Sequence, residues 1–356
     1  MLLRSWRRLA VAFGVLALVA IVGGCGGASS SGGSSSSGDS TAAAQSSGKH
    51  LRFGLVMPDL SNPFEYAIVQ GAKQAAAKDG IELLATGNNA GPAEVNAMQD
   101  YIAAHVNVIG INSTDPTALG PVVKAATAAH IPVVAVVQGR TDPRMVSSVT
   151  LDWYSAGKVV GQAVATGFCT KYPTCKVAIV QGTASDAAGL ASGNGLVAGL
   201  QSKPNVKIVA QAATGYDATK ALNVTQNFLS SHSDLNFIPT WWSAGTLSAV
   251  QGIAASGKTG QVGTSSISGA CPDIADVIKG TIYADSMSFP ELIGQDFINT
   301  GLQLVHHQSV PKQINTPIYP ITTDTAKALL SGKMTPPANL PVMAHLKQAQ
   351  SGQCPH

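Results

Sequence analysis

Short apolar segments alternate with longer amphipathic segments along most of this chain. The short segments predict buried strands, and apolar residues at helical spacing predict the helices between them. In the first half we expect strands at 51–57, 81–85, 106–112 and 131–137, and helices at 64–79, 92–105 and 118–130. The second half repeats this order, with strands at 176–181, 206–210, 235–240 and 260–264 and helices at 190–201, 218–232 and 245–256.

This alternation predicts an α/β fold with two doubly wound parallel-sheet lobes. Strands that alternate with helices form parallel sheets, with helices on both faces and right-handed crossovers. Two such units in one chain imply two lobes with a cleft between them. Because ligands of open parallel sheets bind outside the carboxyl ends of the strands, we expect the specificity in the loops after each strand.

The N-terminal residues predict export. Met1–Arg8 is a short basic region, and an apolar run follows at 9–22 that is too short to span a bilayer comfortably. The next residues, Val22-Gly23-Gly24-Cys25, resemble a bacterial lipobox, in which the cysteine is acylated and becomes the first residue of the mature chain. The alternative is an ordinary signal peptide with an incidental cysteine.

A tether follows the predicted lipidation site at Cys25. Residues 26–48 are almost entirely Gly, Ser and Ala and show no apolar period, so they are expected to behave as a flexible linker. We therefore predict a signal peptide at 1–24 and a lipidated tether at 25–48. The globular part then lies outside the cytoplasm, anchored to the outer face of the cytoplasmic membrane.

Charge argues against nucleic acid as a partner. Charged residues make up 12% of the chain, and the formal net charge is +3. Removal of Arg4, Arg7 and Arg8 with the signal segment lowers that charge to zero. A neutral chain without a basic stripe lacks the phosphate-neutralising side chains on which most nucleic-acid affinity depends.

Four cysteines remain in the predicted mature body after Cys25. An even number in an exported protein predicts disulfides, and four cysteines allow three pairings. Cys169 and Cys175 flank a turn and are expected to pair, which leaves Cys271 to tie Cys354 in the C-terminal tail to the second lobe. The rival interpretation, a zinc site, requires closely spaced cysteines or neighbouring histidines, and we expect no metal.

Seven stretches between Leu51 and about Thr323 stand out by their order and spacing. They are Pro58–Phe64, Gly71-Ala72, Ile111–Asp115, Ile131–Val136, Val180–Gly182, Leu222–Asn227 and Phe289–Gly294. Together they resemble the type I periplasmic binding proteins, the ribose-binding-like group of sugar receptors.

The resemblance implies a receptor that binds a small molecule for the membrane permease of an ABC transporter, as a monomer and without catalysis or cofactor. It implies that the chain crosses between lobes near Leu151–Asp152, Ser288–Phe289 and Thr316–Pro317. The N-terminal lobe then contains 50–151 and 289–316. The C-terminal lobe contains 152–288 and 317–335, and 336–356 form a tail beyond the usual end of the family.

Ligand-binding positions follow from the same resemblance. Asn62 and Phe64 occupy the first-lobe loop that contacts ligand, and Glu65 stands where sugar receptors often have a second aromatic residue. Further candidates in loops or near a crossing are Asn88, Asn89, Asp115 and Ser288. Asn62 is also expected to cap a helix, and a turn or cap role is an alternative for the other polar loop candidates.

The chain departs from the sugar-receptor pattern at its charged positions. The usual Asp-Arg pair of the first lobe falls on Val137-Gln138, the second-lobe arginine on Leu190, and the usual aspartate on Ser265. The usual asparagine falls on Trp241 or Trp242, at least one of which we expect in the cleft. The site is therefore expected to rely on aromatic surface, from Phe64, Trp153, Tyr216, Trp241, Trp242 and Phe289. A sugar is the family expectation, and a glycoside, cyclic polyol or aromatic compound is the less polar alternative.

Enzymatic interpretations find little support. Residues 252–259 match the P-loop pattern, but they close a predicted helix, whereas a phosphate-binding loop follows a strand and opens a helix. His306-His307 has no spaced carboxylate or cysteine nearby, and no nucleophile elbow is present. The best enzyme alternative, an extracellular hydrolase, therefore lacks its nucleophile. A receptor that signals to a membrane partner is a further alternative.

Overall fold

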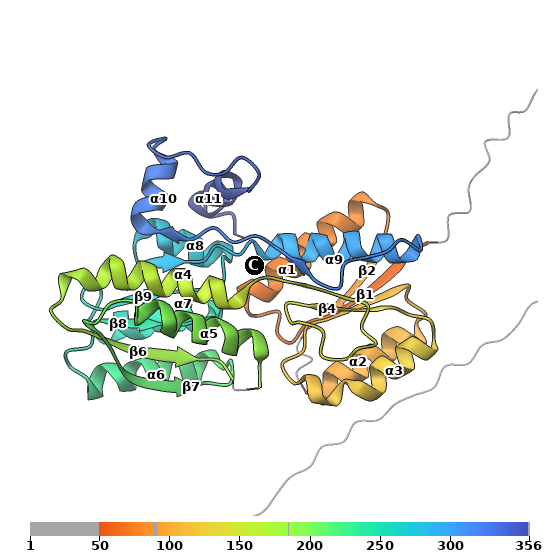
Figure 1. The fold of residues 1–356 in the computed structure, drawn as a ribbon, viewed down its shortest axis with the longest axis horizontal. Helices are drawn as coiled ribbons and strands as arrows, with labels where there is room; N and C mark the ends of the chain where they lie inside the picture. Colours follow the sequence, from red (N-terminus) through yellow and green to blue (C-terminus); the bar gives the residue numbers. More distant parts are fainter. Residues whose placement is uncertain (1–49, 88–90, 184, 355–356) are drawn as a thin grey trace, which may run out of the picture. The chain divides into compact units, whose positions relative to one another are not determined.

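Two six-stranded sheets organise the residues that the structure describes. This computed structural model describes residues 50–87, 91–183 and 185–354 (Figure 1). Cys25, the predicted signal peptide, the tether, Asn88 and Asn89 lie outside the described residues. Each sheet belongs to one lobe, so the α/β fold with two parallel-sheet lobes is confirmed.

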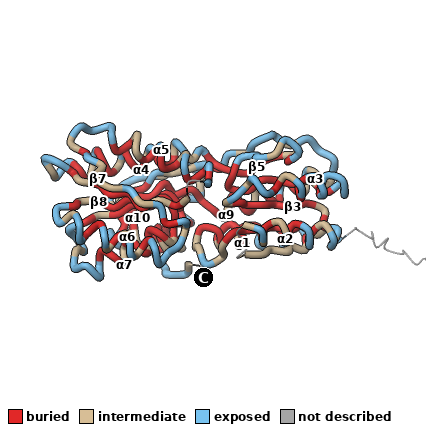
Figure 2. Tube along the Cα trace, turned by 90° about the horizontal axis from the view of Figure 1, so that it is seen from below, coloured by how far each residue is buried: buried red, intermediate tan, exposed pale blue. Residues whose placement is uncertain are grey.

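The first sheet has the strand order β11-β5-β4-β3-β1-β2, and every neighbouring pair is parallel. Its strands are β1 (Arg52–Val56), β2 (Glu82–Thr86), β3 (Val108–Ile111), β4 (Val133–Val136), β5 (Ser147–Thr150) and β11 (Ile314–Asn315). Strands β1, β3 and β4 are buried almost throughout because helices cover both faces (Figure 2).

The second sheet repeats this order as β12-β10-β9-β8-β6-β7. Its strands are β6 (Cys175–Gln181), β7 (Val206–Ala213), β8 (Phe237–Pro239), β9 (Gly263–Ser265), β10 (Ala284–Asp285) and β12 (Ile321–Thr322). All pairs are parallel except β10 with the edge strand β12, which is antiparallel. The chain passes from one sheet to the other between β5 and β6, between β10 and β11, and between β11 and β12.

Four helices cover the first sheet. They are α1 (Pro63–Lys78), α2 (Pro92–Ala103), α3 (Gly120–Ala128) and α9 (Pro290–Val305). Helices α1 and α9 pack together on one face, and α2 and α3 belong to a separate core on the other. Glycine permits the close approach of α1 and α9, since a Cβ at Gly71 would overlap the carbonyl oxygen of Glu291 and one at Gly294 that of Ile68.

The second sheet has the same arrangement, with α4 (Trp153–Thr166) and α5 (Ala187–Leu200) as one packed pair and α6 (Ala218–Ser231) and α7 (Ser243–Ala255) as another. Gly157 and Gly195 lie at the contact of α4 with α5. A Cβ at either position would overlap a carbonyl oxygen of the facing helix, which explains the glycine-rich sequence of α5.

The C-terminal residues form a third cluster beside the second lobe. Helices α8 (Cys271–Lys279), α10 (Thr323–Leu330) and α11 (Val342–Gln350) share a buried apolar core (Figure 1). Cys271 is joined to Cys354, and Cys169 is joined to Cys175 after the 3-10 turn Phe168–Lys171. This is the pairing that the spacing of the cysteines favours.

Several sequence predictions need correction. Residues 260–262 form a turn rather than the start of a strand, because Gly260 has a φ of 77°. The predicted helix 118–130 begins later, since Pro116–Ala118 forms a separate 3-10 turn before α3. The periodic pattern also misses strand β5, whose sequence is mostly Ser and Thr. Its hydroxyl groups are buried because they bond to carbonyls, as Ser147 Oγ does to Pro311 O at 2.7 Å.

Two motifs considered above are placed by the structure. The P-loop match closes α7 and turns at Gly257, which has a φ of 66°, so it has the wrong context for phosphate. His306 and His307 are exposed at the end of α9. Within the described ranges no helix is long and apolar enough to cross a membrane.

Candidate functional site

One cavity lies beside the positions where the strand order of each sheet reverses. In each sheet the strand order reverses beside the first strand of the lobe, β1 or β6, and this is where open α/β sheets bind ligands. Loops after β1, β3, β6 and β8 contribute to a cavity of about 770 Å³ that both lobes line. A volume of this order accommodates a small molecule.

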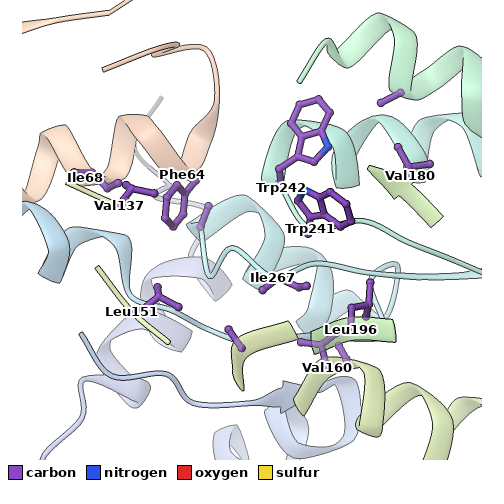
Figure 3. Close-up of a cluster of buried hydrophobic side chains, with 14 of the residues drawn as sticks. Phe64, Ile68, Val137, Leu151, Val160, Val180, Leu196, Trp241, Trp242 and Ile267 are labelled. Atoms are coloured by element: carbon purple, nitrogen blue, oxygen red, sulfur yellow. The ribbon is translucent and has the colours of Figure 1, made fainter. Parts of the chain in front are cut away.

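Aromatic rings form part of the cavity wall on both lobes. Phe64 at the start of α1 meets Trp153 edge-on, with ring centroids 5.9 Å apart. On the second lobe, Tyr216 meets Trp242 edge-on at 5.4 Å. Figure 3 shows Trp241 and Trp242 side by side on the segment before α7, and both residues line the same cavity as Phe64. These rings offer flat apolar surface to a ligand.

A buried carboxyl–amide pair lies at the base of the first lobe. Asn112, which follows β3, donates from Nδ2 to both oxygens of Glu65 at 3.0 Å. The pKa of Glu65 is raised to about 8, first by burial and then by the charges of Asp186 and Asp59, against the lowering effect of the hydrogen bond from Asn112. Glu65 is therefore largely protonated at neutral pH in this environment and can donate as well as accept a hydrogen bond.

A second polar group joins the two lobes. The Gln138 side chain, which follows β4, donates from Nε2 to Asp186 Oδ1 at 2.6 Å. Asp186 also accepts a hydrogen bond from Tyr216 Oη at its other oxygen. Burial, followed by the negative charge of Asp186, raises the pKa of Tyr216 well above its usual value, so the phenol keeps its proton as a donor.

Helix capping explains why two of these polar side chains stand where they do. Asn62 caps α1 by accepting from the Phe64 amide at 3.3 Å, and Asp186 caps α5 by accepting from the Ala188 amide at 3.0 Å. The two residues occupy equivalent positions after the first strand of each lobe. A local capping requirement therefore delivers a polar side chain to the cavity from both sides.

Two lining residues have strained backbones. Val137 has a φ of 69° and Tyr216 a φ of 62°, in a region that non-glycine residues rarely adopt. The carbonyl of Val137 accepts hydrogen bonds from Trp153 Nε1 at 2.9 Å and from Thr150 Oγ1 at 2.5 Å, and these bonds hold the unusual conformation. Such strain is concentrated at functional sites.

Most of the sequence-predicted residues are brought together here. Those that line the cavity are Asn62, Phe64, Glu65, Asp115, Gln138, Trp153, Tyr216, Trp241 and Trp242.

Four predicted positions lie outside the lining. Leu190 is 41% exposed on the outer side of α5, and Ser265 at the end of β9 is fully buried. Ser288 is buried in the crossing before α9, where its hydroxyl donates to the Ser268 carbonyl. Phe289 is also buried in that crossing, and its ring packs edge-on against His345 of the C-terminal cluster at 5.6 Å.

Sequence reasoning missed two buried polar residues of the site, Asn112 and Asp186. Asn112 is the last residue of the predicted strand 106–112, and Asp186 lies in the loop after the predicted strand 176–181, so the rule that placed specificity at strand ends applied to both. Alignment to the sugar-receptor pattern instead drew attention to Leu190 and Asp115. It also led to the expectation of a less polar site, whereas the lining combines the predicted rings with five carboxyl side chains.

The structure offers no obvious metal centre within its described residues, since no group of three or more His, Cys, Asp or Glu side chains is gathered there.

The comparisons with known proteins agree with this geometry. Residues 53–309 match the family model described as periplasmic binding protein domain. The chain belongs to the periplasmic binding protein family. Within that family it is of the ribose-binding-like, type I group, which consists of substrate-binding proteins rather than enzymes.

Individual relatives are similar over most of their length. The ribose import binding protein of Escherichia coli is 28% identical over 257 residues, which cover 72% of this chain and 85% of that protein. An ABC transporter solute-binding protein of Mycobacterium smegmatis, solved with bound glycerol, is 28% identical with a TM-score of 0.72, covering 79% of this chain and 96% of that one. Another Mycobacterium smegmatis structure, in complex with β-D-fucofuranose, shares the fold at 20% identity and a TM-score of 0.73, covering 85% and 98%.

Proposed function

We propose that this periplasmic binding protein captures a small polyhydroxylated solute, a sugar or a sugar-like molecule, for an ABC importer. The observation that carries the proposal is the cavity at the switch points of both sheets, where ring faces stand beside buried polar groups. Rings stack on the apolar faces of a sugar, while Gln138, Asn112 and the carboxyl groups can bond its hydroxyls. The relatives named for ribose import support the same solute class.

Binding is proposed to work through the relative position of the lobes. Each lobe contributes part of the lining, and Gln138 and Asp186 link the lobes directly. A solute that contacts both walls stabilises the joined arrangement by its differential affinity, and a membrane permease then recognises that arrangement.

The proposal includes attachment to the outer face of the cytoplasmic membrane through Cys25. The basic N-terminal region, the short apolar run and the lipobox-like sequence support this anchor. The two cysteine pairs, Cys169–Cys175 and Cys271–Cys354, are proposed to form in the same oxidising compartment.

Thermal unfolding with a solute panel tests this function. The chain from residue 26 onward is unfolded with sugars, polyols, nucleosides and aromatic acids. A bound solute at about 100 times its Kd adds roughly 2.7 kcal/mol to the free energy of unfolding. We expect a sugar or polyol to raise the Tm, and the exposed variant Leu190→Ala to respond equally. Failure of every solute to raise the Tm would contradict the proposal.

A second candidate keeps the fold and transport role but changes the solute class. The rings of Phe64, Trp153, Tyr216, Trp241 and Trp242 favour an aromatic or heterocyclic ligand. A rise in Tm with these compounds alone would favour this candidate over the sugar.

A further inference from the structure

The charge of the cavity lining is one-sided. Five lining residues carry a carboxyl group: Asp59 and Glu65 near the start of α1, Asp115 after β3, Asp186 before α5, and Asp217 before α6. None of the lining residues that the structure describes is Lys, Arg or His. Glu65 is largely protonated, so four carboxylates remain. The N-terminal ends of α1, α2, α4, α5, α6 and α7, whose first or capping residues line the cavity, offset roughly half a unit charge each, which leaves an excess of about one negative charge.

An unpartnered acceptor lies within this region. Asn112 is 2% exposed. Its Nδ2 donates to the Glu65 carboxyl group, while its Oδ1 has no hydrogen-bond partner. A buried acceptor left unpaired costs free energy, so a ligand that supplies a donor to this oxygen would relieve that cost. Glu65 stands beside it with further acceptor capacity.

The raised pKa of Glu65 agrees with this excess of negative charge at the cavity. Its pKa is raised first by burial and then by the negative charges of Asp186, on the facing lobe, and Asp59. No described cationic side chain at the cavity offsets these charges. A cation placed beside Asp186 and Asp59 offsets their negative charge and favours ionisation of Glu65, whereas a neutral solute does neither.

Aromatic surface is suited to the same ligand. Ring faces attract cations, with a gain of roughly 0.5 kcal/mol at exposed positions and more where water is excluded. Trp241 and Trp242 are more than nine-tenths buried, and they stand in the same cavity as Asp186. Their ring faces and the carboxylate can therefore act on one bound group.

We propose that the natural solute carries a positively charged amine, as an amino sugar or another small organic cation does. The proposal rests on the solute-binding function inferred above and specifies the chemical class of its ligand. Its ammonium group is held between Asp186 and the Glu65–Asn112 pair, and its remaining surface lies against the rings.

Calorimetric titration with pairs of similar shape and different charge tests the proposal. Each pair differs in one positive charge: D-glucosamine with D-glucose, D-galactosamine with D-galactose, and benzylamine with benzyl alcohol. We expect the cationic member of at least one pair to bind tenfold or more tightly than its neutral counterpart. The first two pairs and the third distinguish an amino sugar from an aromatic cation.

Two variants locate the effect. Asp186→Asn keeps the helix cap and the shape of the side chain but removes its charge. Glu65→Gln keeps the shape at the other wall and prevents the side chain from ionising beside a bound cation. Either is expected to reduce the preference for the cation by tenfold or more. The control, Asp234→Asn, removes an exposed carboxylate just before β8, at the amino ends of the strands and away from the cavity. It should leave the preference for the cation unchanged.

Each outcome has a separate meaning. If the neutral member of every pair binds as tightly as its cationic counterpart, the cation proposal is overturned and the solute-binding function stands. A preference for the cation that survives in both cavity variants also overturns it. If no member of any pair binds and no solute of the larger panel raises the Tm, both the cation proposal and the proposed function fail.

Discussion

The Gln138 side-chain amide donates a hydrogen bond to the Asp186 carboxylate across the cleft, with 2.6 Å between Nε2 and Oδ1. Gln138 follows a strand of the first sheet and Asp186 caps a helix of the second, so this bond connects the lobes at the candidate site. Two further bonds cross the cleft: the Ala188 amide donates to Gln138 Oε1 at 3.2 Å, and Ser185 Oγ donates to the Thr114 carbonyl at 3.1 Å. A hydrogen bond to a charged group contributes about 1.5–3 kcal/mol, enough to influence how often the lobes are joined.

Gln138→Ala is expected to weaken solute binding by roughly tenfold, because each 1.4 kcal/mol changes an equilibrium constant tenfold. Without the bond the joined arrangement of the lobes is less populated, so part of the binding free energy is used to join the lobes and the measured affinity falls. Titration calorimetry measures the Kd, and Leu190→Ala serves as a control outside the cavity. An unchanged Kd in Gln138→Ala would show that the bond has no part in binding.

Two tryptophans are expected to respond differently when the indole N–H is removed. Trp153 Nε1 donates to the Val137 carbonyl, whereas Trp242 Nε1 is buried without a hydrogen-bond partner. Trp153→Phe should lower the free energy of unfolding by about 1 kcal/mol, the value of one hydrogen bond. Trp242→Phe should instead weaken solute binding about fivefold, because its N–H is available to the solute. Denaturant unfolding measures the stability of both variants, and titration measures their solute affinity. A loss of affinity without a loss of stability in Trp153→Phe, with the opposite result in Trp242→Phe, would refute these two roles.

The stability of the protein is expected to fall as pH rises from about 5 to about 8. Burial raises the pKa of Glu65 from 4.5 to about 8, and burial raises that of Asp273 from 3.8 to about 8. The unfolded chain therefore loses these protons at a lower pH than the folded chain, which favours unfolding progressively across this window. Asp142 does not contribute to this change in stability, because its hydrogen bond to Arg144 lowers its pKa to about 2 and it stays ionised above pH 5.

Tm measurements from pH 5 to pH 9 test this dependence. Glu65→Gln should reduce the fall in Tm, because glutamine retains the shape and an acceptor for Asn112 but does not titrate. A Tm that rises across the window, or an unchanged slope in Glu65→Gln, would contradict the raised pKa of Glu65.

Cys271 and Cys354 join positions 83 residues apart, and Cys169 and Cys175 only 6. Loop-closure entropy grows with loop length, from roughly 2.5 kcal/mol for the short loop to roughly 4.5 kcal/mol for the long one. Replacing Cys271 and Cys354 by alanine is therefore expected to lower stability more than replacing the other pair. It should also make α11 accessible to protease, since the bond ties the end of the chain to α8. Limited proteolysis and Tm values check both effects, and a larger loss from the short-loop pair would contradict them.

Membrane attachment is expected to depend on Cys25. In a bacterial host, the full chain with Cys25→Ala should lose labelling by a radioactive fatty acid and leave the membrane fraction. Cys169→Ala serves as a control, since that cysteine belongs to the folded body. Membrane attachment that persists in Cys25→Ala would contradict the anchor.

Much of the fold could be predicted because its helices and strands have clear periods. The strand 176–181 and the helix 218–232, for example, agree with β6 and α6 to within one residue at each end. Strand β5 could not be found in this way, since Ser147, Ser148 and Thr150 are buried through hydrogen bonds rather than through apolar character.

The site could be predicted only in part, because its charge depends on contacts between lobes. The aromatic residues were recognisable one by one, and those placed at strand ends do line the cavity. The role of Asp186 depends on Gln138, which is 48 residues away in the sequence and belongs to the other lobe. A residue that caps a helix gives no sign in the sequence that its other side faces a cavity.

A crystal structure of the chain with the tightest-binding solute of the panel tests the central claim most directly. We predict that the solute lies in the cavity between the lobes, with its flat face against Phe64 or Trp242 and polar contacts to Asp186 and to Glu65 or Asn112. A solute bound on the outer surface, or held by one lobe without these residues, would contradict the account.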